Sequence, residues 1–308
     1  MPLYYRNRVL LAKTEATEKT DAVPTGAANA IQVSNLTIEP FANNAVDRNL
    51  ITASMGHQGT IPTGVHVRMT FAVEMAGSGT AGTAPAYAPL LLGCGMNETV
   101  NAGVDVVYGP HSEAGDSLTF YVNVAGTLHA AVGSRGTWSL DTNSEGLPVF
   151  SFTFTGVWVT PTAAALPIPD FSAFQATPAV GDVNSQFSAF GQSLVLQSLS
   201  TDLGNTIAYR DRVNSEGVNR TDRQSTGRLV VDAPPLATWD AFAAARAAAG
   251  GAIQFVHGTS PGNIVQLDIP NAQVSNPSYG EDQGITTLQM DLAIKPVSGD
   301  DELTITVR

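Results

Sequence analysis

The five histidines are the side chains with the widest chemical scope, because a neutral imidazole binds metal ions and a titrating one transfers protons. None of them forms a His-x-x-x-His pair, which would place two ligands on one face of a helix, and none adjoins the single cysteine. We therefore interpret them as structural or solvent-facing residues. They are His57, His66, His111, His129 and His257.

Motifs for nucleophilic or nucleotide chemistry are missing from the sequence. It contains no Gly-x-Ser-x-Gly nucleophile motif, no Gly-x-x-x-x-Gly-Lys phosphate loop and no dinucleotide-binding fingerprint at a strand-to-helix turn. Gly77, Gly79 and Gly82 form a glycine-rich run, but no lysine follows it, so the run is typical of a flexible loop. We expect no enzymatic activity, no cofactor and no metal site.

Neighbouring carboxylates could in principle form a hydrolase or calcium site. Glu113 with Asp116, Glu281 with Asp282, and the run from Asp300 to Glu302 all lie in predicted turns. The Asp-x-Asp spacing of a calcium loop is absent. We interpret these carboxylates as solvated turn residues.

The chain is acidic overall. It has 27 Asp and Glu against 15 Lys and Arg, a net charge of -12, and its lysines are Lys13, Lys19 and Lys295. Binding to nucleic acid needs clusters of basic residues that neutralise phosphates, so ordinary DNA binding is excluded. The acidity serves either solubility or a function that requires repulsion of polyanions.

The chain is long enough to form two domains. It has 308 residues, of which 43% are hydrophobic, and no uninterrupted apolar run could span a membrane. The N-terminus, MPLYYRNRVL, is too polar for a signal sequence, so we expect folding in the cytosol. Cys94 is the single cysteine, which excludes an internal disulfide.

Gly109 to Pro161 contains the strongest strand pattern, which predicts four consecutive β-strands. A turn at Gly126, a break at Gly133 to Gly136 and a loop from Asn143 to Pro148 separate them. The predicted strands are Asp116 to Val124, Thr127 to Val132, Thr137 to Thr142 and Val149 to Thr160.

Before this block, alternation predicts three more strands, and a short helix is expected at Tyr87 to Leu92. Residues 1 to 30 form a polar N-terminal segment with an apolar start, which either frays or pairs with a neighbouring edge strand. Phe41 to Thr63 is irregular. The three strands are Ile31 to Pro40, Val65 to Glu74 and Asp105 to Tyr108.

The second half repeats the order of the first, which predicts two tandem β-sandwich or barrel domains, each flanked by a short helix. A proline-rich linker, residues 161–190, separates a first domain at 1–160 from a second at 191–308. The second helix, Trp239 to Ala249, is expected to be capped by Thr238 and ended by Gly250 and Gly251. The strands of the second half are predicted at Ser193 to Leu199, from Leu229, at Phe255 to His257, Asn263 to Ile269, Ile285 to Ile294 and Leu303 to Val307.

Tyr209 to Arg228 is dense in arginines and acids, and we interpret it as a long charged loop. A loop of this length inside a compact domain is unusual unless it reaches a partner. Mixed charges suit docking onto a second copy of the chain better than docking onto DNA.

The chain resembles the tail tube (major tail) proteins of long-tailed bacteriophages. The resemblance lies in the order of its elements: strand, strand, charged loop, strand, short helix and strand, followed by Thr127 to Val159 and a proline-rich linker. The resemblance implies a virion protein, made in the host cytoplasm, that forms stacked rings in a long, non-contractile tail. An acidic channel through the rings would carry DNA during genome ejection without binding it specifically. Single-domain tube proteins form hexamers, so a two-domain chain would form trimers with pseudo-sixfold symmetry; ring stoichiometry stays open.

The resemblance also implies partners: further copies of the chain, and the tape-measure, terminator and tip proteins of the tail. We expect acids on strands and hairpins to line the channel, namely Glu39, Glu74, Asp268 and Asp291. We expect contacts between subunits at Leu3, Tyr4, Tyr5, Asp47, Arg48, Asp211, Arg212, Arg220 and Arg223. The alternatives are the tube of a contractile machine, a capsid-decorating protein and a fimbrial subunit.

Overall fold

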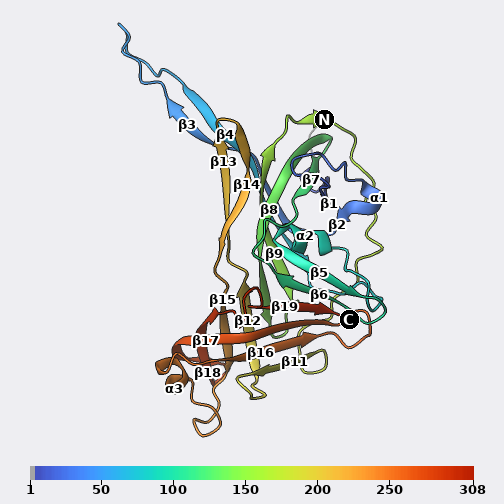
Figure 1. Ribbon diagram of the computed structural model, residues 1–308, viewed down its shortest axis with the longest axis vertical. Helices are drawn as coiled ribbons and strands as arrows, with labels where there is room; N and C mark the ends of the chain where they lie inside the picture. The colour runs from blue at the N-terminus through green and yellow to red at the C-terminus, as the bar shows by residue number, and fades with distance from the viewer. Residues whose placement is uncertain (1–3) are drawn as a thin grey trace.

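The computed structural model describes residues 4–308, which form an elongated, mainly β molecule with three short helices (Figure 1). The first half contains β1 (Arg8–Thr14), α1 (Gly26–Asn29), β2 (Ala30–Ile31), β3 (Ser34–Asp47), β4 (Thr60–Glu74), α2 (Ala88–Gly93), β5 (Met96–Asn101), β6 (Asp105–Pro110), β7 (Leu118–Val124), β8 (Thr127–Asn143) and β9 (Val149–Trp158). The second half contains β10 (Thr162–Ala163), β11 (Ser185–Ala189), β12 (Leu196–Asp202), β13 (Asn205–Arg212), β14 (Ser215–Arg223), β15 (Thr226–Asp232), α3 (Ala241–Arg246), β16 (Gly250–His257), β17 (Val265–Asp282), β18 (Ile285–Ile294) and β19 (Thr304–Val307). The mainly β fold class is therefore confirmed.

The predicted break at Gly133 to Gly136 is wrong, because β8 runs through it as one strand. The strand has a β-bulge between Val132 and Arg135, where Gly133 adopts a positive φ of 59°. β9 pairs with β8 on both sides of this bulge, whereas β7 pairs with it only as far as Ser134 and β12 pairs with it from Ser139 onward. The bulge thus lies where one neighbour of β8 changes from β7 of the first half to β12 of the second.

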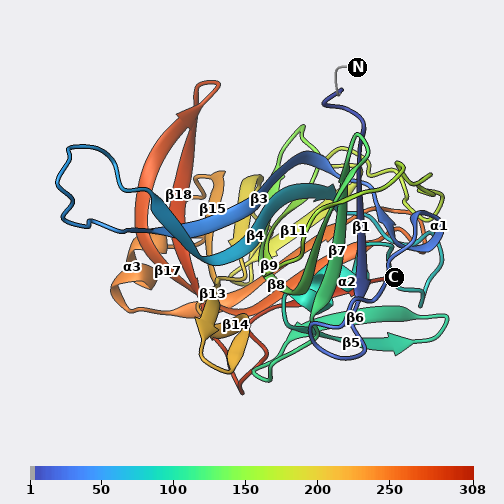
Figure 2. The ribbon, with the colours of Figure 1, turned by 90° about the horizontal axis from the view of Figure 1, so that it is seen from above.

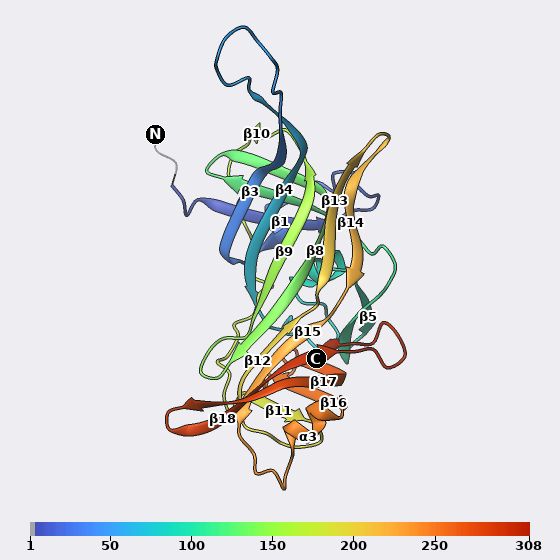
Figure 3. The same ribbon diagram turned by 90° about the vertical axis from the view of Figure 1, so that its left-hand side faces the viewer.

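The charged segment Tyr209 to Arg228 is not a loop. It lies in two antiparallel strands, β13 and β14, joined by a tight turn at Val213 and Asn214. Figure 3 shows this hairpin rising beside β8. The sequence did not predict these strands, because few residues on the inward side are apolar and the period-2 alternation of polar and apolar residues is therefore weak.

Three smaller expectations are also tested. Of the two alternatives for the N-terminal residues, strand pairing holds for Arg8–Thr14, which is β1 and pairs with β7 and β2 of the same chain. Phe41 to Thr63 is not irregular throughout, since β3 and β4 extend into it on both sides. Asp240, rather than Thr238, caps α3 by accepting a bond from the Ala243 amide, and the helix ends before Gly250, which begins β16.

The two halves share one order of paired strands. In the first half the order is β3-β4-β9-β8-β7-β1, and in the second it is β12-β15-β18-β17-β16-β11, with every pair antiparallel. β10 joins the start of β8, and β19 joins the start of β17. This order equates β16 with β7 and β17 with β8.

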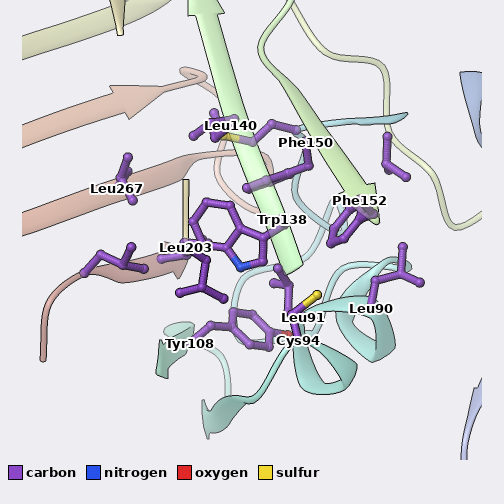
Figure 4. Packing of buried hydrophobic residues seen from close by; sticks show 14 of the residues in the cluster. Leu90, Leu91, Cys94, Tyr108, Trp138, Leu140, Phe150, Phe152, Leu203 and Leu267 are labelled. Carbon is purple, nitrogen blue, oxygen red and sulfur yellow. The ribbon is translucent and has the colours of Figure 1, made fainter. Parts of the chain in front are cut away.

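The halves are joined edge to edge. β8 pairs with β12, and β6 pairs with β19, so one sheet continues from the first half into the second, as β8, β12 and β15 show in Figure 3. One buried cluster extends from Leu10 to Val307 through both halves. Figure 4 shows its centre, where Trp138 lies between Phe150 and the α2 region. The indole nitrogen of Trp138 donates to the sulfur of Met96.

Candidate functional site

The largest functional surface is the side of the joined sheet that faces away from the core. The sheet runs β3-β4-β9-β8-β12-β15-β18-β17, and alternate residues of every strand point to this side, which we call the polar face. Threonines, serines and acids dominate it. Because antiparallel partners share a face, one row crosses seven strands: Glu74, Val149, Asp141, Ser200, Arg228, Asp291 and Ser275.

Acids outnumber basic residues on the polar face. Its exposed cations are Arg68 and Arg228, and no carboxylate within the described residues lies in salt-bridge range of either. Arg228 donates to the side-chain oxygen of Gln289 at 2.7 Å. The polar face therefore has a negative electrostatic potential overall, and Arg68 and Arg228 are the two positive charges within it. Its acids are Glu39, Glu74, Asp141, Asp202, Asp232, Asp282 and Asp291.

The structure brings together three of the four predicted channel acids. Glu39, Glu74 and Asp291 are exposed on the polar face. Asp268 lies elsewhere, on the first part of β17 between β16 and β19, where Gln254 and Gln266 each donate to it at 2.7 Å. Sequence reasoning missed Asp141 and Arg228, although the alternation of their strands could have placed them on the side opposite the buried residues.

A second surface is formed where the β13–β14 hairpin, which we call the arm, packs on β8, β9 and β4 of the first half. Val218 of the arm is fully buried against Val132 and Val157. Tyr209 stacks on His66 with ring centroids 4.8 Å apart. The arm thus covers part of the polar face of the first half with a small apolar contact of its own.

Two arginines fix the arm at its base. Arg220 donates to the backbone oxygens of Gly95 at 2.9 Å and of His111 at 2.6 Å, and also to that of Glu113. Arg223 forms ion pairs of 2.8 Å with both Asp300 and Glu302. These bonds connect the arm to the first half and to the loop before β19.

Asp300 is part of this cluster. Hydrogen bonds from Ser112, reinforced by Arg223, lower the pKa of the Asp300 carboxyl. The side chains of Arg223 and Glu302 are only 10% and 11% exposed, so this ion pair is shielded from water. Shielded pairs of this kind lose much stability when one partner is removed.

The N-terminal segment joins the same contact. Arg135 at the bulge of β8 donates to the Val218 carbonyl at 2.6 Å and pairs with Glu18 at 3.1 Å, and this bond lowers the pKa of Glu18. Lys19 reaches the Glu216 carbonyl of the arm. The arm is therefore held by both termini and by β8.

The predicted contacts between subunits fall into three groups. Arg220 and Arg223 are engaged inside the chain, as described. Asp211 and Arg212 near the tip of the arm, and Asp47 and Arg48 at the end of β3, are exposed. Tyr4 and Tyr5 are also exposed, with the Arg8 guanidinium over the Tyr5 ring, while Leu3 lies outside the described residues.

The outer part of the β3–β4 hairpin has the same place in the first half that the arm has in the second, because β3 and β4 correspond to β12 and β15, between which the arm is inserted. This outer part projects from the molecule (Figures 1 and 2), and the connection from 48 to 59 carries two apolar side chains, Ile51 and Met55, that are fully exposed. No other segment within residues 4–308 packs on this end. Fully exposed apolar side chains at a projecting tip are typical of a contact surface.

The described residues hold no group of three or more His, Cys, Asp or Glu side chains arranged to bind a metal ion. Among residues 4–308 there is also no helix of the length and hydropathy needed to cross a bilayer. The site is thus made of sheet edges, a polar face and projecting hairpins.

The chain was compared with known protein families, and the family model described as phage tail tube protein matches residues 6–307. No curated protein matches the chain. The family match spans both halves and the connection between them, in agreement with the resemblance noted in the sequence.

Proposed function

The chain belongs to the phage tail tube protein family, and from this membership we propose that it is a structural subunit whose copies close into rings that stack around a channel for DNA. Each ring would contain a continuous sheet formed by the joined strands of neighbouring copies. The single observation that carries the proposal is that the joined sheet ends in two free edges, β3 and the end of β17.

Free sheet edges are a hazard in a monomer, because their unpaired backbone groups recruit other strands. In a closed ring each edge is paired with the next copy, and no edge remains. β3 pairs only with β4, and residues 278–282 of β17 pair only with β18, within the described chain. Two such edges at opposite ends of one sheet suit head-to-tail closure.

The chain supplies two similar units to this ring. The matching strand orders of the two halves support a division into two similar units. The expected boundaries at 160 and 191 shift, because β10 pairs with β8 of the first unit and β11 pairs with β16 of the second. Three chains then place six similar units around the axis. The joint between β8 and β12 is the equivalent, inside one chain, of the joint between chains.

The polar face is proposed to line the channel. DNA must move through a tube without being held, and a wall rich in carboxylates repels phosphates and limits adhesion. Glu39, Glu74 and Asp291 lie on this face, and Asp268 does not. In this assignment the protein belongs to a long, non-contractile virion tail, acts in genome ejection, and meets the tape-measure, terminator and tip proteins at the tube ends.

Electron microscopy of the purified protein in negative stain tests the proposal. We expect hollow rings or tubes, with class averages showing threefold symmetry and six similar lobes. A chain that remains monomeric at high concentration, with or without seeding by tail fragments, would overturn it. Solid fibres or capsid-bound monomers would favour a fimbrial or decorating protein instead.

Ejection from assembled virions tests the role of the polar face. Lysine at Glu39, Glu74 and Asp291 would replace repulsion by attraction, so DNA release should be slowed. Asp268→Lys is the matched control, because this acid lies on another part of the sheet. Equal release times for the triple variant, the control and the parent would remove the channel assignment while leaving the tube itself in place.

A further inference from the structure

Within one chain, the joint between the two halves has a definite register. β8 and β12 pair antiparallel so that Asp141 faces Ser200, and Ser200 in turn faces Arg228 on β15. All three side chains lie on the polar face. Asp141 and Arg228 are both exposed and are separated by a single strand, a backbone distance of about 10 Å.

The registers identify the equivalent residues of the other unit. β9 and β18 are both ten residues long, and matched end to end they equate Thr155 with Asp291. Thr155 pairs with Arg68 of β4 and Asp291 pairs with Arg228 of β15, so in this alignment the two arginines correspond. On the same basis Val149 faces Asp141, as Ile285 faces Asp282. The aspartates thus correspond as well.

Ser200 corresponds to Glu39, because each residue faces its unit's arginine from the edge strand. Among the equivalent positions of the polar face, the arginine and the aspartate are the charges that both units share. The other acids occur in one unit only, such as Asp291, whose counterpart is Thr155. The shared pair therefore marks the edges at which units meet.

We propose that the same charged row crosses the joint between chains: Asp282 at the end of β17 lies opposite Glu39 on β3 of a second copy, with Arg68 of that copy on the next strand. The inference rests on the proposed ring and goes further by naming the strands, the register and the charges. Glu39 then lies directly opposite Asp282, and Arg68 lies one strand further in, about 10 Å from Asp282, so the row fixes one repulsion and one attraction across the joint.

The charges on this row would select the register in which two chains pair. A slip of two residues would keep every side chain on its proper face, so burial alone does not select between such registers. At about 10 Å the attraction between Asp and Arg is weak in water, which suits a role in selecting register and partner more than in adding stability. Glu39 places a second carboxylate beside Asp282, where the joint inside the chain has an uncharged serine.

Cysteine cross-linking of assembled tubes tests the register. The native Cys94 is buried, so introduced cysteines would be the reactive ones. The variant Glu39→Cys with Asp282→Cys should form covalent dimers and trimers on mild oxidation, faster than Thr37→Cys with Asp282→Cys, which reports a slip of two residues. The pair Asp141→Cys with Ser200→Cys is the positive control, since it should close a disulfide inside one chain.

The outcomes separate the two proposals. Tubes in which Thr37→Cys is the better partner, or in which neither pair forms a cross-link although the control does, overturn the register and leave the tube function intact. If the parent chain forms no ring or tube at all, the proposed function fails and this inference fails with it.

Charge exchange gives an independent measurement. Asp282→Arg would place a cation opposite Glu39 and should raise the yield of tubes at low salt by roughly 1.5- to 5-fold per joint, and Glu39→Arg in the same chain should remove that gain. Asp268→Arg, away from both edges, should leave the yield unchanged. Equal yields for these three variants and the parent would overturn the charged row.

Discussion

The arm and the β3–β4 hairpin occupy equivalent places in the two halves, yet one is covered and the other is bare. The arm buries Val218 completely and is fixed by Arg220 and Arg223. The outer part of the β3–β4 hairpin is exposed, with Val46 at 51% and Ile51 fully accessible. The difference is that the arm packs on the other unit of the same chain, whereas no segment of the described chain covers the outer part of the β3–β4 hairpin.

The bend at the base of the arm explains how it reaches its neighbour. Gly204 separates β12 from β13 with φ of 69°, and a Cβ there would lie 1.9 Å from the Gln224 carbonyl oxygen. Only glycine fits such a position. The β3–β4 hairpin has bulges and a positive φ at Gly64, but its two strands are not interrupted and project from the molecule (Figure 1).

The largest effect should come from placing a charge under the arm. Val218→Asp would bury an unpaired carboxylate between Val132 and Val157, which should lower the free energy of unfolding by about 3–5 kcal/mol. Val46→Asp on the bare hairpin should change it by less than about 0.5 kcal/mol. Urea unfolding of the unassembled chain measures both. Similar losses in the two variants would mean that the hairpins do not differ in the way described.

Removal of the ionic anchor should have the next largest effect. Arg223→Ala leaves Glu302, 11% exposed, without its cation and should cost about 1.5–3 kcal/mol. Arg48→Ala, at the end of the exposed β3, is the matched control and should be neutral. Thermal unfolding followed by circular dichroism distinguishes them. An unchanged unfolding temperature for Arg223→Ala would show that the ion pair does not hold the arm.

A smaller effect is expected at the free edge. Glu39→Ser copies the serine of the joint inside the chain and removes a like-charge pair, so each joint between chains should gain about 0.2–1 kcal/mol. Tubes of this variant should dissociate at a higher temperature, measured by light scattering. Glu74→Ser, on the same face but away from the edge, serves as control. A lower dissociation temperature for Glu39→Ser would contradict the proposed register.

The smallest effect on stability is expected when the pH is lowered. Because the pKa of Asp300 is lowered in the folded chain from a value near 3.8, its stabilising bonds are present above that value and are lost as the pH falls through the folded pKa. The parent should therefore exceed Asp300→Asn in stability above about pH 4, and the gap should narrow in more acidic solution. Urea midpoints over a pH series measure this gap. A constant gap would mean that the Asp300 charge does not contribute.

Much of the architecture could be read from the sequence. The period-2 pattern predicted the strands near β4, β7, β9 and β18, and the order of elements predicted a repeat. The pattern failed where charge and apolar character no longer alternate simply: the arm was taken for a loop, and Gly133 for a strand end. In both places the fold depends on contacts with distant strands, which local periodicity does not contain.

The candidate site divides in the same way. The sequence by itself determined the excess of acid, the absence of catalytic motifs and the strand-forming runs, because composition and alternation are properties of the chain alone. Only the tertiary structure decided that Asp268 lies outside the polar face and that Asp141 shares a row with Arg228. It also decided that Arg220 and Arg223 form their hydrogen bonds and ion pairs with residues of the same chain. Those facts follow from the registers of strands far apart in sequence, and long-range pairing is set by the packing of the whole sheet.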